Sequence, residues 1–484
     1  MRRRDAVRLI PLTIAGISGA ASRGSFGETP VNRHMPSRKP LSERYLEKVR
    51  EMLVRIRETQ SENLLEASYA IARTVMNGQT CWYSWDMGHS VLADIYAGRN
   101  GVPEIFTPGY YHAKAREGDL LLASLWDGLS AFIEGHGFES QAGQPENIEP
   151  PDVRNKGVFI VGAPAPWGLD AKGPELIIYY SAKHRIRPSA DIWIETNVTK
   201  LGAVLSVPGM GAPVGPVSGI VGMVTFWMMV ADACRILARN GLSVPVRGDD
   251  PVPAGENVPR VSLHAPLMDD YFERVMNQIE MIGAEFGCVR QAAVMAVDAV
   301  LAGGKVYCYS GNRNALAYES QTRRGGLSLT RGIYDENGKL SVFGKDFRGE
   351  SRDLAIMGIS QPDNKTDLLH LDTFRKCGMK VVSMGPMTRD TVIPDGRTVP
   401  KEADLHIGRM CDTYGLFAVP GFERRICPTS GALLNQVFWA TCMEIVDEIM
   451  RRTGNVPGVY LTGAVTGGIE HLNRVNTIYE ERGY

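Results

Sequence analysis

Long segments of helical periodicity alternate with short apolar runs along this chain. Apolar residues recur every three or four positions over residues 41–77 and again over 271–302, so both segments predict long helices. The runs 80–84, 306–309 and 354–359 are short and apolar or aromatic, which is typical of strands in the middle of a parallel sheet. This alternation predicts an α/β fold with parallel sheets.

A strand–helix–strand unit is clearest between residues 352 and 385. An apolar run is followed by a polar loop, Ser360–Thr366, then by a helical period that ends at Gly378, and then by a second apolar run. The loop lies between the carboxyl end of a strand and the amino end of a helix. Backbone N–H groups are free at such places, and they bind anions and polyhydroxylated ligands. The loop is equally typical of an ordinary helix start, with Thr366 or Asp367 as the N-cap.

The same order of elements occurs twice, on either side of a segment at 244–266 that carries five prolines. The matching landmarks lie between 212 and 234 residues apart, and they pair Thr80–Ser84 with Val306–Tyr309, Asp119–Ala123 with Asp353–Gly358, Ala190–Ile194 with Ala403–Ile407, and Pro216–Gly219 with Pro428–Gly431. We therefore predict two three-layer αβα domains with parallel sheets, Rossmann-like or flavodoxin-like and related by internal duplication. The first domain covers 41–245, a linker covers 246–267, and the second domain with its carboxy-terminal tail covers 268–484.

Three short motifs resemble those of the SIS (sugar isomerase) domain family. Gly88-His89-Ser90 followed by Ala93-Asp94 is similar to that family's Gly-His-Ser…Ala-Glu helix, and Gly311-Asn312-Arg313-Asn314 followed by Tyr318-Glu319 resembles its Gly-x-Gly-Arg-Ser variant. The loop Ser360–Thr366 resembles the family's Ser-x-Ser-Gly-x-Thr loop for sugar phosphates, with Pro362-Asp363 in place of Ser-Gly. The resemblance covers the chain from about residue 41 to residue 468, and tandem SIS domains also form the isomerase half of glucosamine-6-phosphate synthase.

The resemblance implies an enzyme that binds a small-molecule sugar or sugar phosphate and moves a proton beside a carbonyl, as aldose–ketose isomerases and some lyases do. It implies Glu319 as the base, with Asp94 as the counterpart in the first half, and His89 or His471 as the proton donor. Polar residues and glycines of the three motifs, with one serine further on, would bind substrate: Gly88, Ser90, Gly311, Asn312, Arg313, Asn314, Ser360, Gln361, Asn364, Thr366 and Ser430. A homo-oligomer such as a dimer is expected on the same basis.

A different class of function stays open. A chain that kept the fold and lost the base would be a catalytically silent sugar-binding or regulatory protein. Glu319 would then be a solvated helix carboxylate and His89 a helix cap. His406 lies within a predicted strand and is interpreted as structural, whereas His471 follows two glycines in a tail that could fold over the site.

Composition excludes several other classes of function. The net charge is −1 and charged residues make up 22% of the chain, so no nucleic-acid partner is indicated. The eight cysteines are scattered and form no Cys-x-x-Cys, so neither a disulfide framework nor a zinc site is implied. The glycine-rich stretch 209–215 follows no clean strand and opens no helix, so it is not a dinucleotide-binding loop. We expect neither a cofactor nor a metal.

The amino terminus resembles a secretory signal of the twin-arginine kind. Arg2-Arg3-Arg4 precedes an apolar run at 9–17, and small residues follow at 18–22. The apolar run is too short and too often interrupted by Gly and Pro to span a bilayer. The expectation is a leader and linker over 1–40, cleavage after about Ala21, and a periplasmic or exported mature protein that lies outside the membrane. The alternative is an unstructured start on a cytoplasmic protein.

Overall fold

The structure is a computed structural model of the whole chain. It describes residues 39–84, 94–95, 100–108, 116–125, 157–164, 191–198, 202–248, 261–310, 316–320, 323–336, 339–342, 344–386, 396–408, 415–461 and 468–484. The predicted leader lies outside these residues. Residues 37–484 form one compact unit, so the domain boundary at 246–267 stays a prediction.

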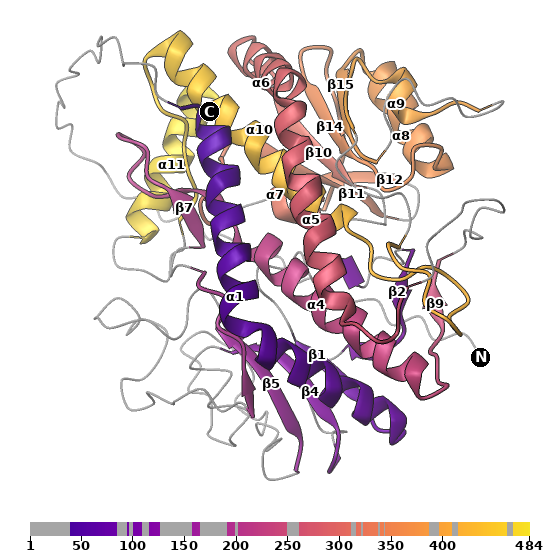
Figure 1. Cartoon of the computed structure of the whole chain (residues 1–484). Coiled ribbons are helices and arrows are strands. Elements are labelled where there is room, and N and C mark those ends of the chain that lie inside the picture. The colour runs from indigo at the N-terminus through magenta and orange to yellow at the C-terminus, as the bar shows by residue number, and fades with distance from the viewer. Residues whose placement is uncertain are drawn as a thin grey trace, which may run out of the picture. The chain divides into compact units, whose positions relative to one another are not determined.

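Five long helices pack against one another and against the sheets (Figure 1). They are α1 (Leu41–Met76), α4 (Ser218–Arg239), α5 (Leu267–Ala284), α6 (Phe286–Leu301) and α10 (Ser430–Thr453). The long helix expected over 271–302 is therefore two helices, α5 and α6, which meet at Glu285. Periodicity alone missed this break, because no proline or glycine occupies the junction itself.

The first sheet has five parallel strands, formed by the first half of the chain. Its order across the sheet is β3 (Phe106–Pro108), β1 (Cys81–Ser84), β4 (Leu120–Leu125), β5 (Phe159–Pro164) and β6 (Ile192–Trp193). Helices α1 and α4 belong to this sheet: α1 packs on β1, β4 and β6, and Phe226 of α4 makes a T-shaped ring contact with Tyr83 of β1.

The second sheet has the same arrangement in its parallel part. Its order is β11 (Thr330–Glu336), β10 (Val306–Ser310), β14 (Leu354–Gly358), β15 (Lys380–Met384) and β16 (Leu405–Ile407). Two antiparallel strands, β12 (Lys339–Val342) and β13 (Lys345–Asp346), extend it beyond β11. Numbered along the chain within each half, the parallel strands of both sheets follow the order 2-1-3-4-5, which is that of flavodoxin-like folds. The predicted α/β fold with parallel sheets is confirmed, and the shared strand order supports the predicted duplication.

Helices cover both faces of the second sheet. The side chains of β10 alternate, so that Val306 and Cys308 join the main core with α6 and α10, while Tyr307 and Tyr309 join a smaller core. That smaller core is closed by α8 (Lys365–Lys376) and α9 (Val399–Glu402). The second half is therefore a three-layer αβα sandwich, with one covering layer on each face of its sheet.

Each half caps the first helix of the other. Helices α1 and α5 both start after a proline, Pro40 and Pro266, which offers no side-chain cap. The free N–H of Leu41 instead donates to Asp447 of α10, and that of Leu267 donates to Asp232 of α4, both at 2.9 Å. A carboxylate at a helix start is favourable because it meets unpaired N–H groups and the positive end of the helix dipole.

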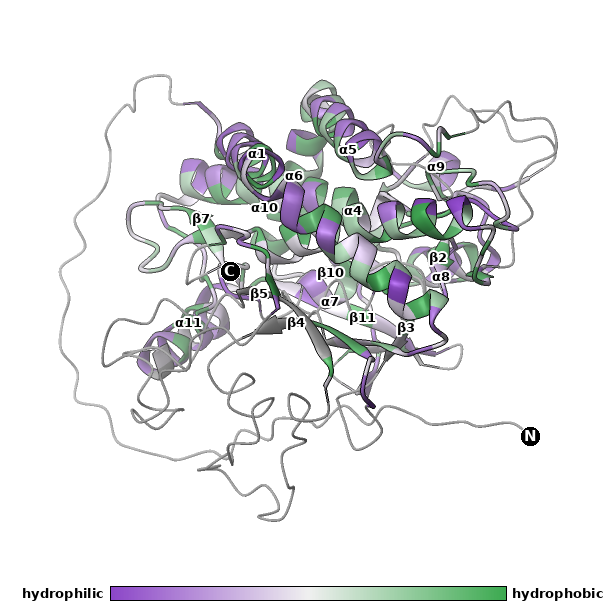
Figure 2. Ribbon diagram, turned by 60° about the horizontal axis from the view of Figure 1, so that its bottom comes forward, coloured by the Kyte–Doolittle hydropathy of each residue, from purple (hydrophilic) through white to green (hydrophobic). Residues whose placement is uncertain are grey.

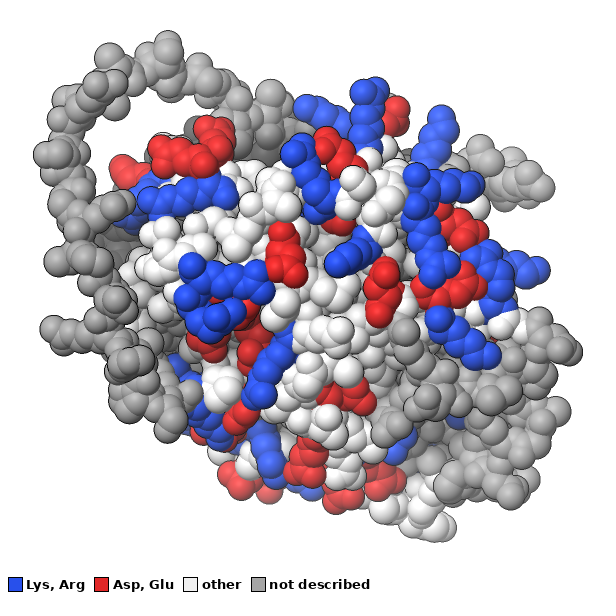
Figure 3. Space-filling model, turned by 90° about the horizontal axis from the view of Figure 1, so that it is seen from above, with Lys and Arg blue, Asp and Glu red and all other residues white. Residues whose placement is uncertain are grey.

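Helix α4 is buried along almost its whole length, from Ser218 to Leu237, and much of it is coloured as hydrophobic in Figure 2. By length and composition it is long and apolar enough to cross a membrane, but the candidate segment is entirely buried by the surrounding protein. Core helices meet the same criteria, and the complete burial of this segment is that of a core helix. On the face shown in Figure 3, blue and red side chains are interspersed over the surface.

The remaining elements are short or lie at the edges. They are β2 (Val102–Pro103), which pairs with β9 (Val246–Arg247), β7 (Ala203–Leu205), which pairs with β8 (Val214–Pro216), the single helical turn α7 (Leu316–Ser320), and the tail helix α11 (Gly468–Arg482). Helix α7 follows β10 and packs against both β10 and α10. It therefore joins the carboxyl edge of the second sheet to the helical layer.

Candidate functional site

The predicted ligand loop lies at the carboxyl edge of the second sheet. It follows β14, and its residues Ser360 and Gln361 are both buried, at 6% exposure. The backbone fixes its start, because the N–H of Ile359 donates to the carbonyl of Met384 at 2.9 Å. Gly385 lies against the same residue: a Cβ there would come within 2.3 Å of the Ile359 side chain. Only glycine fits at this position, so the chain after β15 packs directly against the start of the loop.

Asn364 is the N-cap of α8, and its side chain accepts a hydrogen bond from the N–H of Asp367 at 3.1 Å. The expectation that Thr366 or Asp367 caps this helix is therefore wrong. Thr366 lies in the first turn and is exposed. Asparagine is among the preferred N-cap residues, so the sequence was consistent with Asn364 as the cap.

Asp367 belongs to a buried polar cluster that sequence reasoning missed. Its carboxylate accepts a hydrogen bond from Tyr309 of β10 at 3.1 Å, and His370, one turn further along α8, contacts Asp335 of β11 at 2.9 Å. Burial, followed by the charge of Asp367, raises the pKa of Tyr309 far above its ordinary value, so this hydroxyl stays a donor. The cluster fixes the start of α8 to β10 and β11. Its only sequence signal is the spacing of Asp367 and His370, which puts them on one helix face.

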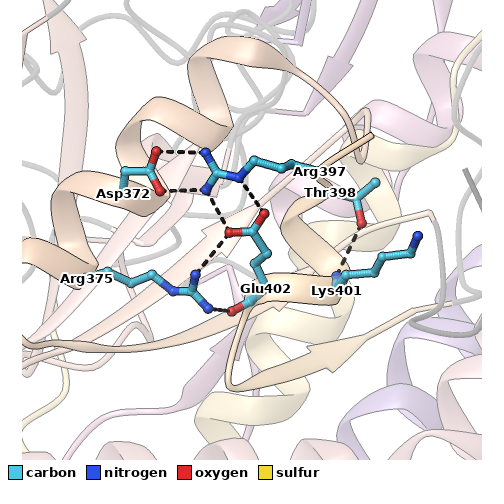
Figure 4. A network of polar contacts seen from close by, with 6 residues as sticks. All are labelled: Asp372, Arg375, Arg397, Thr398, Lys401 and Glu402. Atoms are coloured by element: carbon cyan, nitrogen blue, oxygen red, sulfur yellow. Dashed lines mark hydrogen bonds and ion pairs between the residues drawn. The ribbon is translucent and has the colours of Figure 1, made fainter. Parts of the chain in front are cut away.

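The outer side of α8 is held by exposed ion pairs (Figure 4). Arg397 contacts Asp372 of α8 through two hydrogen bonds and also contacts Glu402 of α9, while Arg375 contacts Glu402 at 3.0 Å. Hydrogen bonds from Arg397 lower the pKa of both carboxylates, Asp372 and Glu402. The helix that follows the predicted ligand loop is therefore anchored on both sides.

Glu319, the predicted base, is fully buried on α7. The indole N–H of Trp439 on α10 donates to its Oε1 at 3.4 Å, and the guanidinium of Arg323 lies 3.4 Å from its Oε2. Arg323 also donates to the hydroxyl of Ser218, at the start of α4, at 3.2 Å. The interpretation of Glu319 as a solvated carboxylate is wrong. Its partner Arg323 joins it to the first half of the molecule through Ser218.

Asp94 has the same kind of environment in the first half. It is fully buried, and the indole N–H of Trp227 on α4 donates to its Oδ2 at 3.1 Å. Trp227 and Trp439 occupy equal places in the motif Pro-x-Ser-Gly-x6-Phe-Trp, which starts at Pro216 in one half and at Pro428 in the other. The match of Asp94 with Glu319 is thus supported by contacts, and the complete motif is a signal that the sequence contained.

A tyrosine supports the same motif in each half. Tyr45 of α1 donates to the carbonyl of Pro216 at 2.6 Å, and Tyr271 of α5 donates to that of Pro428 at 3.2 Å. Both tyrosines lie in the sequence Pro-Leu-x3-Tyr-x-Glu-x-Val, at 40–49 and 266–275. Burial, with a further contribution from Glu319, raises the pKa of Tyr45 well above its usual value. Tyr45 therefore remains a neutral donor close to the predicted base.

The two histidines His471 and His406 both contact other parts of the protein through their rings. His471 of α11 is buried, with Nε2 2.7 Å from the carbonyl of Val459 and Nδ1 3.0 Å from the guanidinium of Arg474. A carbonyl can only accept, so Nε2 carries the proton and Nδ1 accepts. His406 lies in β16, as predicted, with Nδ1 2.8 Å from the hydroxyl of Ser383.

The other predicted site residues divide into two groups. Ser430 is the first residue of α10 and is buried, at 2% exposure. The remaining ones lie outside the described residues: Gly88, His89, Ser90, Gly311, Asn312, Arg313 and Asn314. Within the described residues, no group of three or more His, Cys, Asp or Glu side chains is arranged to hold a metal ion.

No known family model matches this chain. Two bacterial relatives carry the name UPF0309 protein. The one from Geobacillus thermodenitrificans (strain NG80-2) is 23% identical over 226 residues, which is 42% of this chain and 86% of the relative. The one from Geobacillus sp. (strain WCH70) is 24% identical over 230 residues, which is 42% of this chain and 87% of the relative.

Several solved structures are similar over most of the chain. The C-terminal domain of glucosamine-fructose-6-phosphate aminotransferase from Francisella tularensis has a TM-score of 0.38 at 9% identity, covering 84% of this chain and 98% of that one. Glucosamine-6-phosphate deaminase from Thermotoga maritima has a TM-score of 0.37 at 9% identity, covering 85% and 95%. A proposed phosphosugar isomerase from Clostridium difficile has a TM-score of 0.41 at 12% identity, covering 87% and 95%. All three scores are below 0.5, so the fold assignment rests on the chain's own strand order.

Proposed function

We propose that this chain is a SIS-type protein that binds a sugar or sugar phosphate at the carboxyl edge of its second sheet. The observation that carries the proposal is the Ser360-Gln361 loop, which joins β14 to the capped start of α8 at that edge. Ligands of open parallel sheets bind outside the carboxyl ends of the strands, and a helix start there offers N–H groups to oxygen atoms. The resemblance of this loop to the sugar-phosphate loop of SIS domains supports a sugar as the ligand.

Two kinds of activity fit such binding. An aldose–ketose isomerase needs a base that moves a proton between C1 and C2 of the open-chain sugar, and Glu319 is our candidate for it. A catalytically silent sugar-binding or regulatory protein needs no base. Glu319 is completely buried and contacts Arg323 and Trp439. These contacts favour the catalytically silent sugar-binding protein over the isomerase.

Two measurements on the purified chain separate these activities. Thermal unfolding with glucose, N-acetylglucosamine, glucose 6-phosphate and fructose 6-phosphate tests binding, since a ligand that binds the folded state raises Tm. NMR in heavy water then tests for deuterium at C2 of the sugar that binds. A shift in Tm without deuterium supports the silent binder, and deuterium at C2 supports the isomerase. If none of the four sugars raises Tm, the proposal is wrong.

The proposal also includes export and self-association. The Arg2-Arg3-Arg4 start and the apolar run at 9–17 support a twin-arginine signal. Amino-terminal sequencing of protein from the native host should find a start after about Ala21, and an intact Met1 on cytoplasmic protein would contradict export. Light scattering should give the mass of a homo-oligomer rather than that of one 53.1 kDa chain.

A further inference from the structure

Two neighbouring amides in the core of α10 lack partners. Asn435 and Gln436 are fully buried. All four polar atoms of their side chains are closed to solvent, and none has a hydrogen-bond partner in the part of the chain that the structure describes. Buried polar groups in folded proteins are nearly always paired, because an unpaired one loses its hydrogen bonds to water without replacement.

The first half has no polar residues at the same places. Asn435 lies four residues before the tryptophan of the repeated motif, and the equivalent residue in α4 is Met223. Gln436 is likewise equivalent to Val224. Both residues of α4 are fully buried and apolar. The fold therefore accepts apolar side chains at these positions, and the amides of α10 are not required for packing.

Helical spacing places the amides near the proposed ligand edge. Asn435 lies one turn before Trp439 on the same helix face, since residues four apart are neighbours on a helix surface. Trp439 contacts Glu319 of α7, and α7 follows β10 at the carboxyl edge of the second sheet. The turn of α10 that carries the two amides thus lies beside that edge.

We infer that Asn435 and Gln436 are ligand-binding residues, and that they bind hydroxyl groups of the sugar. This inference rests on the proposed function and adds residues of a second element to its site. Each amide offers two donor hydrogens and an acceptor oxygen, and a sugar hydroxyl both donates and accepts, so the two chemistries match. Neither side chain is charged, which favours the neutral hydroxyls over a phosphate group. A protein retains unpaired buried polar groups where function requires them, at a cost in stability.

The amides are closed off in the state described here. A sugar reaches them only when the segments that cover this turn of α10 move, so the bound state must differ from this one around residues 435 and 436. Binding would then supply the hydrogen bonds that the free protein lacks. The inference accordingly predicts opposite effects of the amides on the stability of the free protein and on ligand binding.

The test is the double variant Asn435→Leu, Gln436→Met of the full chain, which keeps the shape of both side chains and removes their polar atoms. Its matched control is Val437→Thr on the same buried turn. Threonine occupies the equivalent position 225 in α4, where its hydroxyl donates to the carbonyl of Val221 within the helix. Thermal unfolding is measured for each protein alone and with glucose, N-acetylglucosamine, glucose 6-phosphate and fructose 6-phosphate.

We expect the double variant to unfold about 2–4 °C higher than the wild type when alone, and to lose the rise in Tm that a sugar gives the wild type. The control should keep that rise. A double variant that gains stability and keeps the full rise overturns the inference and leaves the proposed function intact. One that unfolds at a lower temperature overturns it as well, because the amides must then have partners within the protein. If no sugar raises Tm of the wild type, the proposed function fails and the inference fails with it. If the double variant does not fold, the same two measurements, Tm alone and the rise in Tm with sugar, are made on the single variants Asn435→Leu and Gln436→Met and judged in the same way.

Discussion

The two halves of the chain share a scaffold and differ in the chemistry they carry. Both have a parallel sheet of order 2-1-3-4-5, a tyrosine that donates to a proline carbonyl, and a tryptophan that donates to a buried carboxylate. Asp119 and Asp353 also match, since each accepts hydrogen bonds from two backbone N–H groups beside the first and third strands of its sheet. Contacts present in both halves are those that the fold itself requires.

Among the residues that the structure describes, the second half carries several polar features that the first half lacks. Arg323 accompanies Glu319 there, the amides of Asn435 and Gln436 replace apolar side chains, and two antiparallel strands extend the sheet. The fold does not require a feature that is found in one half and is absent from the equivalent place in the other. They are therefore the first place to look for ligand binding.

The largest difference in stability should come from two equivalent carboxylates, Asp232 of α4 and Glu444 of α10, which both lie 14 residues after the serine of the repeated motif. Asp232 forms a buried ion pair with Arg235 at 2.7 Å and caps Leu267. Asp232→Asn leaves a buried guanidinium without its anion and should cost about 3–5 kcal/mol.

The equivalent change, Glu444→Gln, should be nearly neutral at pH 7. Burial raises the pKa of Glu444, so the folded state favours the neutral acid, which glutamine mimics. The stability contributed by this neutral acid is present at low pH and is lost as pH rises through the raised pKa. The free energy of unfolding of the variant, relative to that of the wild type, should therefore increase as pH rises from 4 to 7. Urea unfolding of both variants measures the contrast. Equal losses at the two positions would contradict it.

An intermediate effect is expected from the two tryptophans. Trp227→Phe and Trp439→Phe each remove the indole donor from a buried carboxylate, and we expect each to cost about 1–3 kcal/mol. The loss should be smaller at Trp439, because its hydrogen bond is longer and Arg323 still contacts Glu319. Chemical unfolding with fluorescence of the remaining tryptophans gives both values. A larger loss for Trp439→Phe would mean that Glu319 depends on its indole partner more than on Arg323.

The smallest effect should follow from Arg397→Gln, which breaks an exposed network of the second half (Figure 4). Arg397 lowers the pKa of Asp372 and Glu402. Carboxylates with lowered pKa contribute stability above their ordinary pKa, and this contribution is lost as pH falls through the lowered values. The variant should therefore be slightly less stable than the wild type at pH 7 and equal to it near pH 2. Unfolding midpoints at the two pH values check this, and a difference that grows in acid would contradict it.

The fold could be predicted from the sequence because its main signals are local. Short apolar runs at 80–84, 306–309 and 354–359 predict buried strands, and the structure places β1, β10 and β14 there. The break between α5 and α6 could not be predicted in the same way. The apolar periodicity continues through Glu285, so it does not show where α5 ends and α6 begins. Their separation depends on packing against other helices, some of them in the other half of the chain.

The site was harder to predict because its polar contacts join residues far apart in the chain. Glu319 is hydrogen-bonded to Trp439 and Arg323 to Ser218, and no local sequence pattern predicts either pair. The repeated Phe-Trp at 226–227 and 438–439 would have indicated a shared role for both tryptophans. Nothing in the sequence alone shows that Asn435 and Gln436 are buried without partners, since that property depends on everything packed around α10.

The most direct test of the proposed sugar site is calorimetric titration of the full chain with glucose, N-acetylglucosamine, glucose 6-phosphate and fructose 6-phosphate. The wild type is compared with the double variant Ser360→Ala, Thr366→Ala of the predicted ligand loop. Thr373→Ala is the control, because its hydroxyl donates to the carbonyl of Leu369 on the exposed side of α8. We predict that at least one of the four sugars binds, that the loop variant weakens its binding at least about tenfold, equivalent to about 1.4 kcal/mol, and that the control binds as the wild type does. Equal affinity of the loop variant and the wild type, or no heat with any of the four sugars, would contradict the proposal that the second sheet holds a sugar at its carboxyl edge.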